Sequence, residues 1–174
     1  STGHAYVFVR SGEGWMPQQM LAAADAASGD FFGGRVALDG DTALIGASSK
    51  KHLVYVGVGA AYVFTRTGSV WTQQPPLLAG DWAMLDAFGK SVALSGGTAV
   101  IGAYLDDHDG QTNAGSVYVF VNTGGSWSQQ AKLVADDAAS YDFFGNTVAI
   151  EGDTAVVGAP QAYPPADRYG PGAA

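Results

Sequence analysis

The sequence predicts an all-β fold, namely a β-propeller made of four-stranded antiparallel blades. The first observation is a 56-residue repeat, which separates Tyr6 from Tyr62 and Tyr62 from Tyr118. A period in this range is typical of solenoids, propellers and arrays. The second observation is that each copy holds short segments rich in β-branched and aromatic residues, separated by turn residues. The third is that these segments are apolar on both faces, as expected for sheets that are covered on both sides.

The first copy of the repeat contains four strand-like segments in order. A tyrosine-containing segment is followed by a glycine-rich turn and by a tryptophan-containing segment, in which Pro17 favours an edge position. A loop then leads to the segment that contains Phe32 and Gly33. A tight turn around Gly40 leads to the last segment. The strands are expected at residues 3–10, 15–21, 32–38 and 42–47.

The repeats define the organisation of one propeller segment, residues 1–174. When a blade is counted from its Phe-Gly strand, the chain holds two full blades and two complementary half-blades. Together, the full blades and half-blades contain the strands of three blades. The expected bounds are 4–21 for the first half-blade, 31–78 and 87–134 for the full blades, 143–160 for the second half-blade and 161–174 for a C-terminal loop.

The composition excludes several classes of function. The net charge of −8 gives no electrostatic footprint for nucleic acid or for an anionic membrane. The chain has no cysteine, so disulfides, thiol catalysis and thiolate metal sites are excluded. No apolar run approaches the ~20 residues needed to cross a bilayer, and we expect no membrane insertion. Because the chain begins without Met and without a signal peptide, inside a repeat, we expect a processed or excised chain.

Three short motifs carry the period: Phe-Gly followed by Val-Ala, then Gly-Asp-Thr, then Gly-Ala-Pro. The last is intact at Gly158, Ala159 and Pro160. Together with the Y-V-F and W-x-x-Q segments, they make the chain resemble the FG-GAP repeats of integrin α-subunit propellers, and more closely bacterial and algal FG-GAP-like repeats. The resemblance covers nearly the whole chain. It implies a β-propeller and an extracellular or cell-surface location, whereas propellers host many unrelated activities.

Two aspartates recur in the loop that precedes each Phe-Gly segment. Aspartate favours turns because its carboxylate accepts hydrogen bonds from neighbouring backbone N–H groups. We therefore expect these residues to stabilise turns, and the alternative is an acidic rim or a set of cation sites. They are Asp25, Asp81 and Asp137 in one position and Asp30, Asp86 and Asp142 in the other.

Calcium is the one cofactor that the sequence indicates. The calcium loops of integrins lie between the Phe-Gly strand and the Gly-Ala-Pro strand, but here that connection has only three residues, so the family's calcium site does not transfer. The loop at 104–113 instead carries Asp106, Asp107 and Asp109 with a glycine and an asparagine. Such oxygen donors suit Ca2+. These three aspartates are the predicted metal ligands, with a solvated acidic loop as the alternative.

Aromatic residues outside the repeated set are the candidates for ligand binding. Twelve aromatics recur at the period and are expected to form the core. Trp82, Tyr104 and Tyr141 lie instead in loops predicted on the same rim as the acidic residues, and Tyr163 and Tyr169 accompany them. Exposed aromatic side chains are good anchors for proteins and sugars, and the alternative is local packing within the loops.

The sequence offers little support for catalysis. The three histidines occupy non-equivalent places in the repeats, and the chain has no nucleophile elbow, phosphate loop or HExxH motif. We therefore expect a non-catalytic extracellular interaction or adhesion module that binds a protein or a glycan through loops on one rim. The alternatives are a structural scaffold that assembles through open blade edges and an accessory part of a carbohydrate-acting enzyme.

The two half-blades lead to an expectation about assembly. Each half-blade leaves one apolar strand edge open, and such edges are templates for pairing with another chain. Two chains related by a two-fold axis would complete each other's half-blades. We therefore expect a homodimer that forms a six-bladed propeller, and the alternative is a longer parent chain that supplies further blades.

Overall fold

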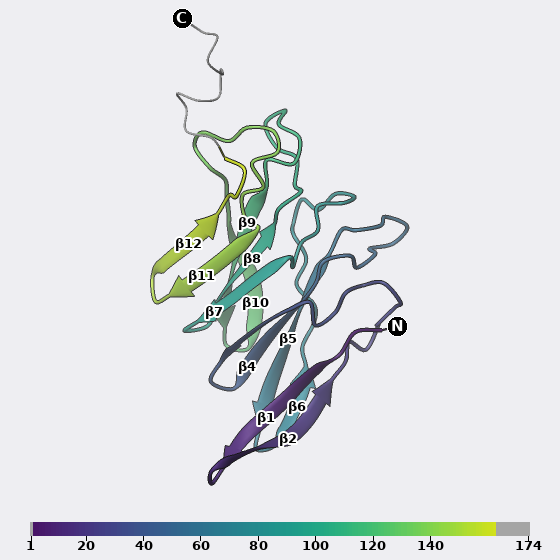
Figure 1. Cartoon of the computed structure of the whole chain (residues 1–174), viewed down its shortest axis with the longest axis vertical. Coiled ribbons are helices and arrows are strands. Elements are labelled where there is room, and N and C mark those ends of the chain that lie inside the picture. Colours follow the sequence, from purple (N-terminus) through teal and green to yellow (C-terminus); the bar gives the residue numbers. More distant parts are fainter. Residues whose placement is uncertain (1, 163–174) are drawn as a thin grey trace, which may run out of the picture.

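Residues 2–162 are described by the computed structural model, and within this range they form twelve strands and no helix. The strands follow one another in chain order as four antiparallel sheets that pack side by side (Figure 1). A membrane-spanning helix is therefore absent from residues 2–162. The strands are β1 (Ala5–Ser11), β2 (Gly14–Leu21), β3 (Arg35–Asp39), β4 (Thr42–Ala47), β5 (Ala60–Thr67), β6 (Val70–Gln73), β7 (Ser91–Ser95), β8 (Thr98–Ala103), β9 (Ser116–Thr123), β10 (Ser126–Leu133), β11 (Thr147–Glu151) and β12 (Thr154–Gly158).

Two of the sheets are complete four-stranded blades. One has the order β3-β4-β5-β6 and the other has the order β7-β8-β9-β10. Their second and third strands pair in the same register, since Ile45 lies opposite Tyr62 and Ile101 lies opposite Tyr118. The repeat in the sequence is thus a repeat in the structure, and the predicted all-β fold of propeller blades is confirmed.

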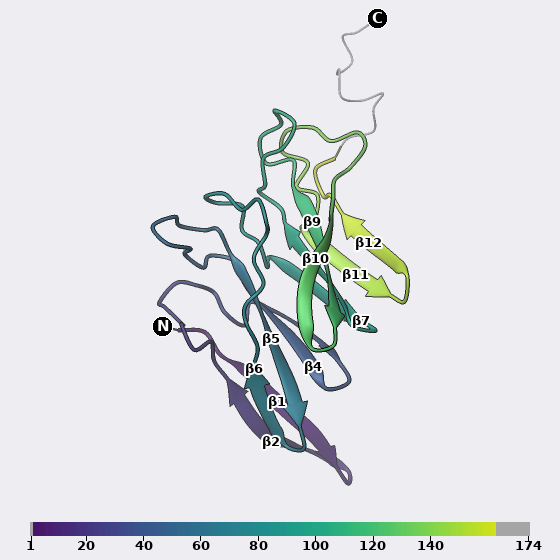
Figure 2. The same cartoon turned by 180° about the vertical axis from the view of Figure 1, so that it is seen from behind.

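The other two sheets are half-blades of two strands each. The hairpin β1–β2 corresponds in sequence to the outer strands β5–β6, and the hairpin β11–β12 corresponds to the inner strands β3–β4. They lie at opposite ends of the stack of sheets, as both views show (Figures 1 and 2). The prediction of two full blades flanked by two complementary half-blades is confirmed, and the described sheets do not close into a ring.

The first strand of each blade lies on the inner side of the stack. Strands β3, β7 and β11 contact one another in sequence order, while β6 contacts β2 on the outer side. Trp71 on β6 fixes this outer contact, because its indole Nε1–H donates to Gln18 Oε1 at 2.8 Å. The Gln19 side chain also accepts from the Trp71 backbone N–H and donates to its carbonyl. The strands that follow the Phe-Gly pairs are therefore inner, and the tryptophan strands are outer.

The Phe-Gly pairs themselves lie outside the strands, which corrects the expected strand at 32–38. The strand begins at Arg35 because Gly33 has a φ of 84°, in the left-handed region. The Gly33 N–H donates to the Gly46 carbonyl at 3.2 Å, and a Cβ built on Gly33 would lie 2.4 Å from the His4 carbonyl oxygen. The Phe-Gly pair is therefore a corner at which two blades approach closely.

Each full blade contains one cluster of three aromatic rings, which we call an aromatic triad. In the second blade, Phe88 packs edge-on against Tyr118 and Phe120, with ring centroids 5.5 and 6.0 Å apart. The first blade repeats this geometry at 5.4 and 6.2 Å. The two triads belong to the two buried clusters that fill the spaces between sheets. The members of the first triad are Phe32, Tyr62 and Phe64.

The expectation that all twelve recurring aromatics form the core is wrong for the first half-blade. Tyr6, Phe8 and Trp15 are exposed, although their counterparts in the first full blade are buried. The difference is not in the residues but in their neighbours, since β1–β2 lacks the two inner strands that cover the corresponding rings elsewhere.

Candidate functional site

A polar cluster lies where the loop before the Phe-Gly corner meets the loop after the second strand. In the first repeat, Tyr62 donates its hydroxyl hydrogen to Asp25 Oδ1 at 2.8 Å. The Lys50 ammonium lies 3.0 Å from Asp25 Oδ2 and 3.1 Å from Asp30 Oδ2. Asp30 also accepts from the Ala27 backbone N–H at 2.8 Å, which confirms its expected role in the turn.

The second repeat builds the same cluster with one more carboxylate. Tyr118 donates to Asp81 Oδ1 at 2.8 Å, as Tyr62 does to Asp25. The cation is now Lys132, whose Nζ lies 2.7 Å from Asp81 Oδ2 and 2.9 Å from Asp106 Oδ2. Asp86 occupies the turn and accepts from the Ala83 N–H.

The cation enters the two clusters from different positions of the repeat. Lys50 and Asp106 stand at equivalent positions, 56 residues apart. At this position the first repeat has the ammonium of Lys50 and the second has the carboxylate of Asp106. Lys132 on β10 supplies the cation that pairs with Asp106. The first cluster therefore sets one ammonium against two carboxylates, and the second sets one ammonium against three.

The cluster shifts the pKa values of its members in consistent directions. Burial disfavours the charged form of Asp25, but hydrogen bonds from Lys50 and Tyr62 outweigh it and hold the pKa of this carboxyl below its ordinary value. Asp81 follows the same pattern with Lys132 and Tyr118. Burial and the adjacent carboxylate raise the pKa of Tyr62, so its hydroxyl remains a donor at all physiological pH values.

Asp86 is the exception, because its pKa is raised to about 6. Burial is the main cause, and the charges of Asp106 and Asp81 add to it, while the hydrogen bond from Ala83 and the charge of Lys132 oppose it. Asp106, the extra carboxylate of the second cluster, thus adds to the effect of burial on the pKa of Asp86.

The raised pKa of Asp86 predicts a pH-dependent stability. The ordinary pKa of an aspartate is 3.8, and between this pH and pH 6 the folded chain binds more protons at Asp86 than the unfolded chain does. The free energy of unfolding therefore falls as the pH rises through this range. Asp86→Asn removes the charge and keeps an acceptor for Ala83. We expect it to stabilise the chain at pH 7 by on the order of 1–2 kcal/mol, and to have little effect at pH 4.

The measurement is thermal unfolding of both proteins from pH 4 to pH 8. Asp153→Asn is the matched control, because Asp153 lies exposed in the β11–β12 turn. Asp25 and Asp81 affect stability only at lower pH, because the stabilisation they give is lost as the pH falls through their lowered pKa values. An effect of Asp86→Asn that is equal at pH 4 and pH 7 would show that ionisation is not its cause.

The three predicted metal ligands do not share one environment. Asp106 is buried, accepts from Ser116 Oγ at 2.6 Å and is ion-paired with Lys132. Asp107 Oδ1 accepts from the Asn113 backbone N–H at 2.6 Å, which closes the loop. Asp109 lies at the exposed tip, 3.2 Å from His108 Nδ1. In the part of the chain that the structure describes, no three carboxyl or imidazole groups gather as a metal site would require.

Two of the three predicted ligand-binding aromatics come together, and Phe143 joins them. The Tyr104 ring lies 5.7 Å from the Phe143 ring, which lies 6.3 Å from the exposed Tyr141 ring. Lys90 Nζ lies 5.0 Å from the centroid of the Tyr104 ring. We call Lys90, Tyr104, Tyr141 and Phe143 the aromatic surface. Trp82 lies apart from it, and Tyr163 and Tyr169 fall outside the described residues.

Trp82 packs against the loop of the preceding repeat. Its ring lies 4.6 Å from the His52 ring and 5.6 Å from the Tyr55 ring. It is partly buried and also packs against the core cluster between the two full blades. Much of the Trp82 side chain is therefore in local packing contacts, which was the alternative expectation for these aromatic residues.

A hollow of about 290 Å³ continues the aromatic surface toward the preceding blade. Phe31, Leu85, Lys90 and Tyr104 contribute to its walls. Phe31, Phe143 and Lys90 were not among the predicted site residues. Phe31 and Phe143 directly precede the Phe-Gly pairs, and both have positive φ values, 59° and 58°. The signal in the sequence was an aromatic that repeats at this position in two of the three copies.

The fold and the repeated interblade contacts define the class: a repeat protein built from β-propeller blades. The FG-GAP repeat model matches residues 15–64, 71–120 and 127–174, so the chain belongs to the FG-GAP repeat family. No curated protein sequence matches the chain. FG-GAP repeats are generally found in extracellular and cell-surface proteins, including proteins of the adhesion type.

Proposed function

We propose that this chain is a non-catalytic extracellular interaction module that binds a protein or a glycan through the aromatic surface. The observation that carries the proposal is the grouping of Tyr104, Phe143 and the exposed Tyr141 beside the Lys90 ammonium. Aromatic rings offer large contact areas at little cost in conformational entropy, and they dominate the energetics of many interfaces. The adjacent hollow provides a concave binding surface next to the rings.

The proposal predicts that Tyr141→Ala weakens ligand binding at least about tenfold, as expected for an interface anchor worth more than about 1.4 kcal/mol. Binding is measured on an array of neutral and acidic glycans and on a panel of immobilised extracellular matrix proteins. Val54→Ala is the control, since Val54 is exposed on a different loop. Because Tyr141 is exposed, the melting temperature of the variant should stay unchanged.

Two further arms make the binding experiment decisive. Tyr55→Ala alters the Trp82 neighbourhood, so a loss of binding there would move the site from the aromatic surface to Trp82. Parallel measurements in calcium and in a chelator test the predicted ligands Asp106, Asp107 and Asp109. Binding that survives Tyr141→Ala unchanged would contradict the proposal.

The second candidate function is a structural scaffold, and the open strand edges favour it. Among the described strands, β1 pairs only with β2 and β12 pairs only with β11. Each therefore presents one unpaired edge, and such an edge can take a strand from another chain. A scaffold of this kind would self-associate without needing the aromatic surface.

A further inference from the structure

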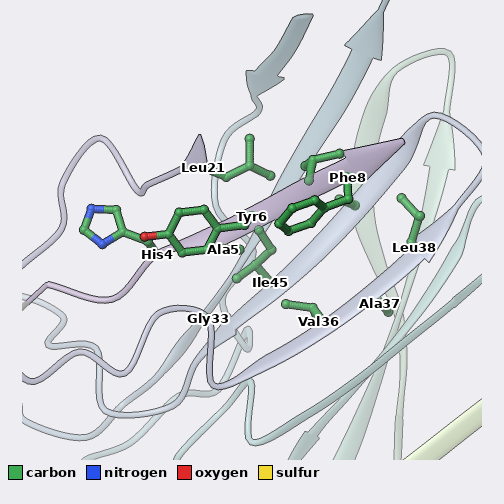
Figure 3. Close-up of a pocket in the computed structure, with 12 residues that line it drawn as sticks. His4, Ala5, Tyr6, Phe8, Leu21, Gly33, Val36, Ala37, Leu38 and Ile45 are labelled. Carbon is green, nitrogen blue, oxygen red and sulfur yellow. The ribbon is translucent and has the colours of Figure 1, made fainter. Parts of the chain in front are cut away.

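An apolar groove of about 580 Å³ runs beside the free edge of β1 (Figure 3). Tyr6 and Phe8 of β1 line one side, and Val36 and Leu38 of β3 line the other. All four side chains are exposed. Contiguous exposed apolar surface is typical of interaction sites.

The chain contains its own template for what fills such a groove. One repeat further on, the equivalent space lies between β5 and the strands β7–β8. The inner hairpin β3–β4 fills it, because Ala37 and Leu44 pack into the cluster that contains Val92, Leu94 and Ile101. These last three residues are the counterparts of Val36, Leu38 and Ile45 of the open groove.

The hairpin β11–β12 carries the side chains that this template requires. Ala149 and Val156 stand at the positions of Ala37 and Leu44, two periods later. Leu44 is fully buried, whereas Val156 is 67% exposed. The same hairpin follows Phe144, the counterpart of Phe32 and Phe88.

The aromatic triads show the same division. Two triads are complete within their blades, each formed by a Phe-Gly phenylalanine with a tyrosine and a phenylalanine of the third strand. The third set is split between the ends of the described structure, with Phe144 beside β11 and with Tyr6 and Phe8 on β1. Bringing β12 to the edge of β1 would assemble it.

We propose that the groove takes the β11–β12 hairpin of a second copy of this chain, with β12 pairing antiparallel to β1. The register follows from the two complete blades, where Thr42 lies opposite Thr65 and Thr98 lies opposite Val121. It places Thr154 of one copy opposite Val9 of the other. Because each copy carries both the groove and the hairpin, two copies exchange hairpins reciprocally about a two-fold axis.

The first test is the mass of the chain in solution by light scattering over a wide range of concentrations. The expected value is twice the chain mass of 17.8 kDa. Phe8→Asp should convert the dimer to a monomer with an unchanged β-sheet circular dichroism spectrum, because Phe8 is 52% exposed within one chain but would be buried in the filled groove. Val70→Asp is the matched control, being 59% exposed on the β5–β6 hairpin, and should remain dimeric.

The second test checks the register by disulfide crosslinking, since the chain has no cysteine of its own. The variant Val9→Cys/Thr154→Cys should give a covalent dimer on mild oxidation. The variant Arg10→Cys/Thr154→Cys should not, because a shift of one residue turns the side chain to the opposite face of the strand. Within one chain these positions lie at opposite ends of the structure, so the crosslink reports on a partner (Figure 1).

A monomer at every concentration overturns the proposal. Equal crosslinking of the two cysteine pairs overturns it as well. This inference rests on the scaffold function, the second candidate, and it fails separately from ligand binding at the aromatic surface. Loss of the dimer in Phe8→Asp leaves the aromatic surface intact, whereas Tyr141→Ala should weaken ligand binding in a chain that still dimerises.

Discussion

Gly102→Ala should unfold the chain or destabilise it by at least about 3 kcal/mol, beyond the usual cost of an added methyl group in a packed core. A Cβ built on Gly102 would lie 2.0 Å from the Gly145 carbonyl oxygen and 2.3 Å from Ser91 Oγ. Both atoms are fixed, because Ser91 Oγ donates to that same carbonyl at 2.7 Å. The methyl group can be accommodated only if the β11–β12 hairpin moves away from the second full blade.

Two control glycines separate this steric effect from backbone effects. Gly14 has open space where an added Cβ would lie and no positive φ, so Gly14→Ala should change stability by less than about 0.5 kcal/mol. Gly124 also has open space but a φ of 60°, so Gly124→Ala should cost about 1 kcal/mol. Urea unfolding followed by tryptophan fluorescence ranks the three. A Gly102→Ala protein within about 1 kcal/mol of the parent chain would contradict this account of the interblade contact.

The second large effect is expected at the centre of an aromatic triad. Phe88 is fully buried and packs against both Tyr118 and Phe120. Phe88→Ala removes its ring from the space between the two full blades, and a buried phenylalanine truncated to alanine costs about 3–5 kcal/mol. The midpoint of urea unfolding should fall accordingly.

Phe31→Ala is the matched control for Phe88→Ala. Each change removes one phenyl ring, but Phe31 is 66% exposed, so its truncation should change stability by less than about 0.5 kcal/mol. A similar loss of stability in both variants would show that the triad does not hold the blades together. A normal midpoint for Phe88→Ala would show the same.

The strand order and the division into blades were predictable from the sequence because their signals are local. The strand β4 has the predicted bounds, since Thr42 follows the turn at Gly40 and the apolar run ends at Ala47. The Phe-Gly corner was placed in a strand because its composition is strand-like. Only the approach of Gly33 to the His4 backbone shows that the chain turns there.

The polar cluster was only partly predictable. The recurrence of Asp25 and Asp81 marked the position, but not the partners. Lys132 lies 51 residues from Asp81, and no pattern in the sequence indicates that it replaces Lys50. Asp106 was expected in an acidic loop, yet burial and the Lys132 ammonium now define its surroundings.

The 56-residue period, the strand-forming segments, the four-stranded blades and their division into complementary halves could all be predicted, because each depends on residue patterns and turn residues within a few positions of one another. The burial of equivalent residues, in contrast, is apparent only in the folded chain. Tyr6 and Tyr62 occupy the same position of the repeat, but only Tyr62 is covered, by the inner strands of its own blade and by the neighbouring sheet. The fold also determines which loops meet, and thus brings Tyr104, Phe143 and Lys90 into one surface. Contacts between blades join residues that are distant in the chain, and the burial of a side chain depends on these neighbours rather than on its residue type.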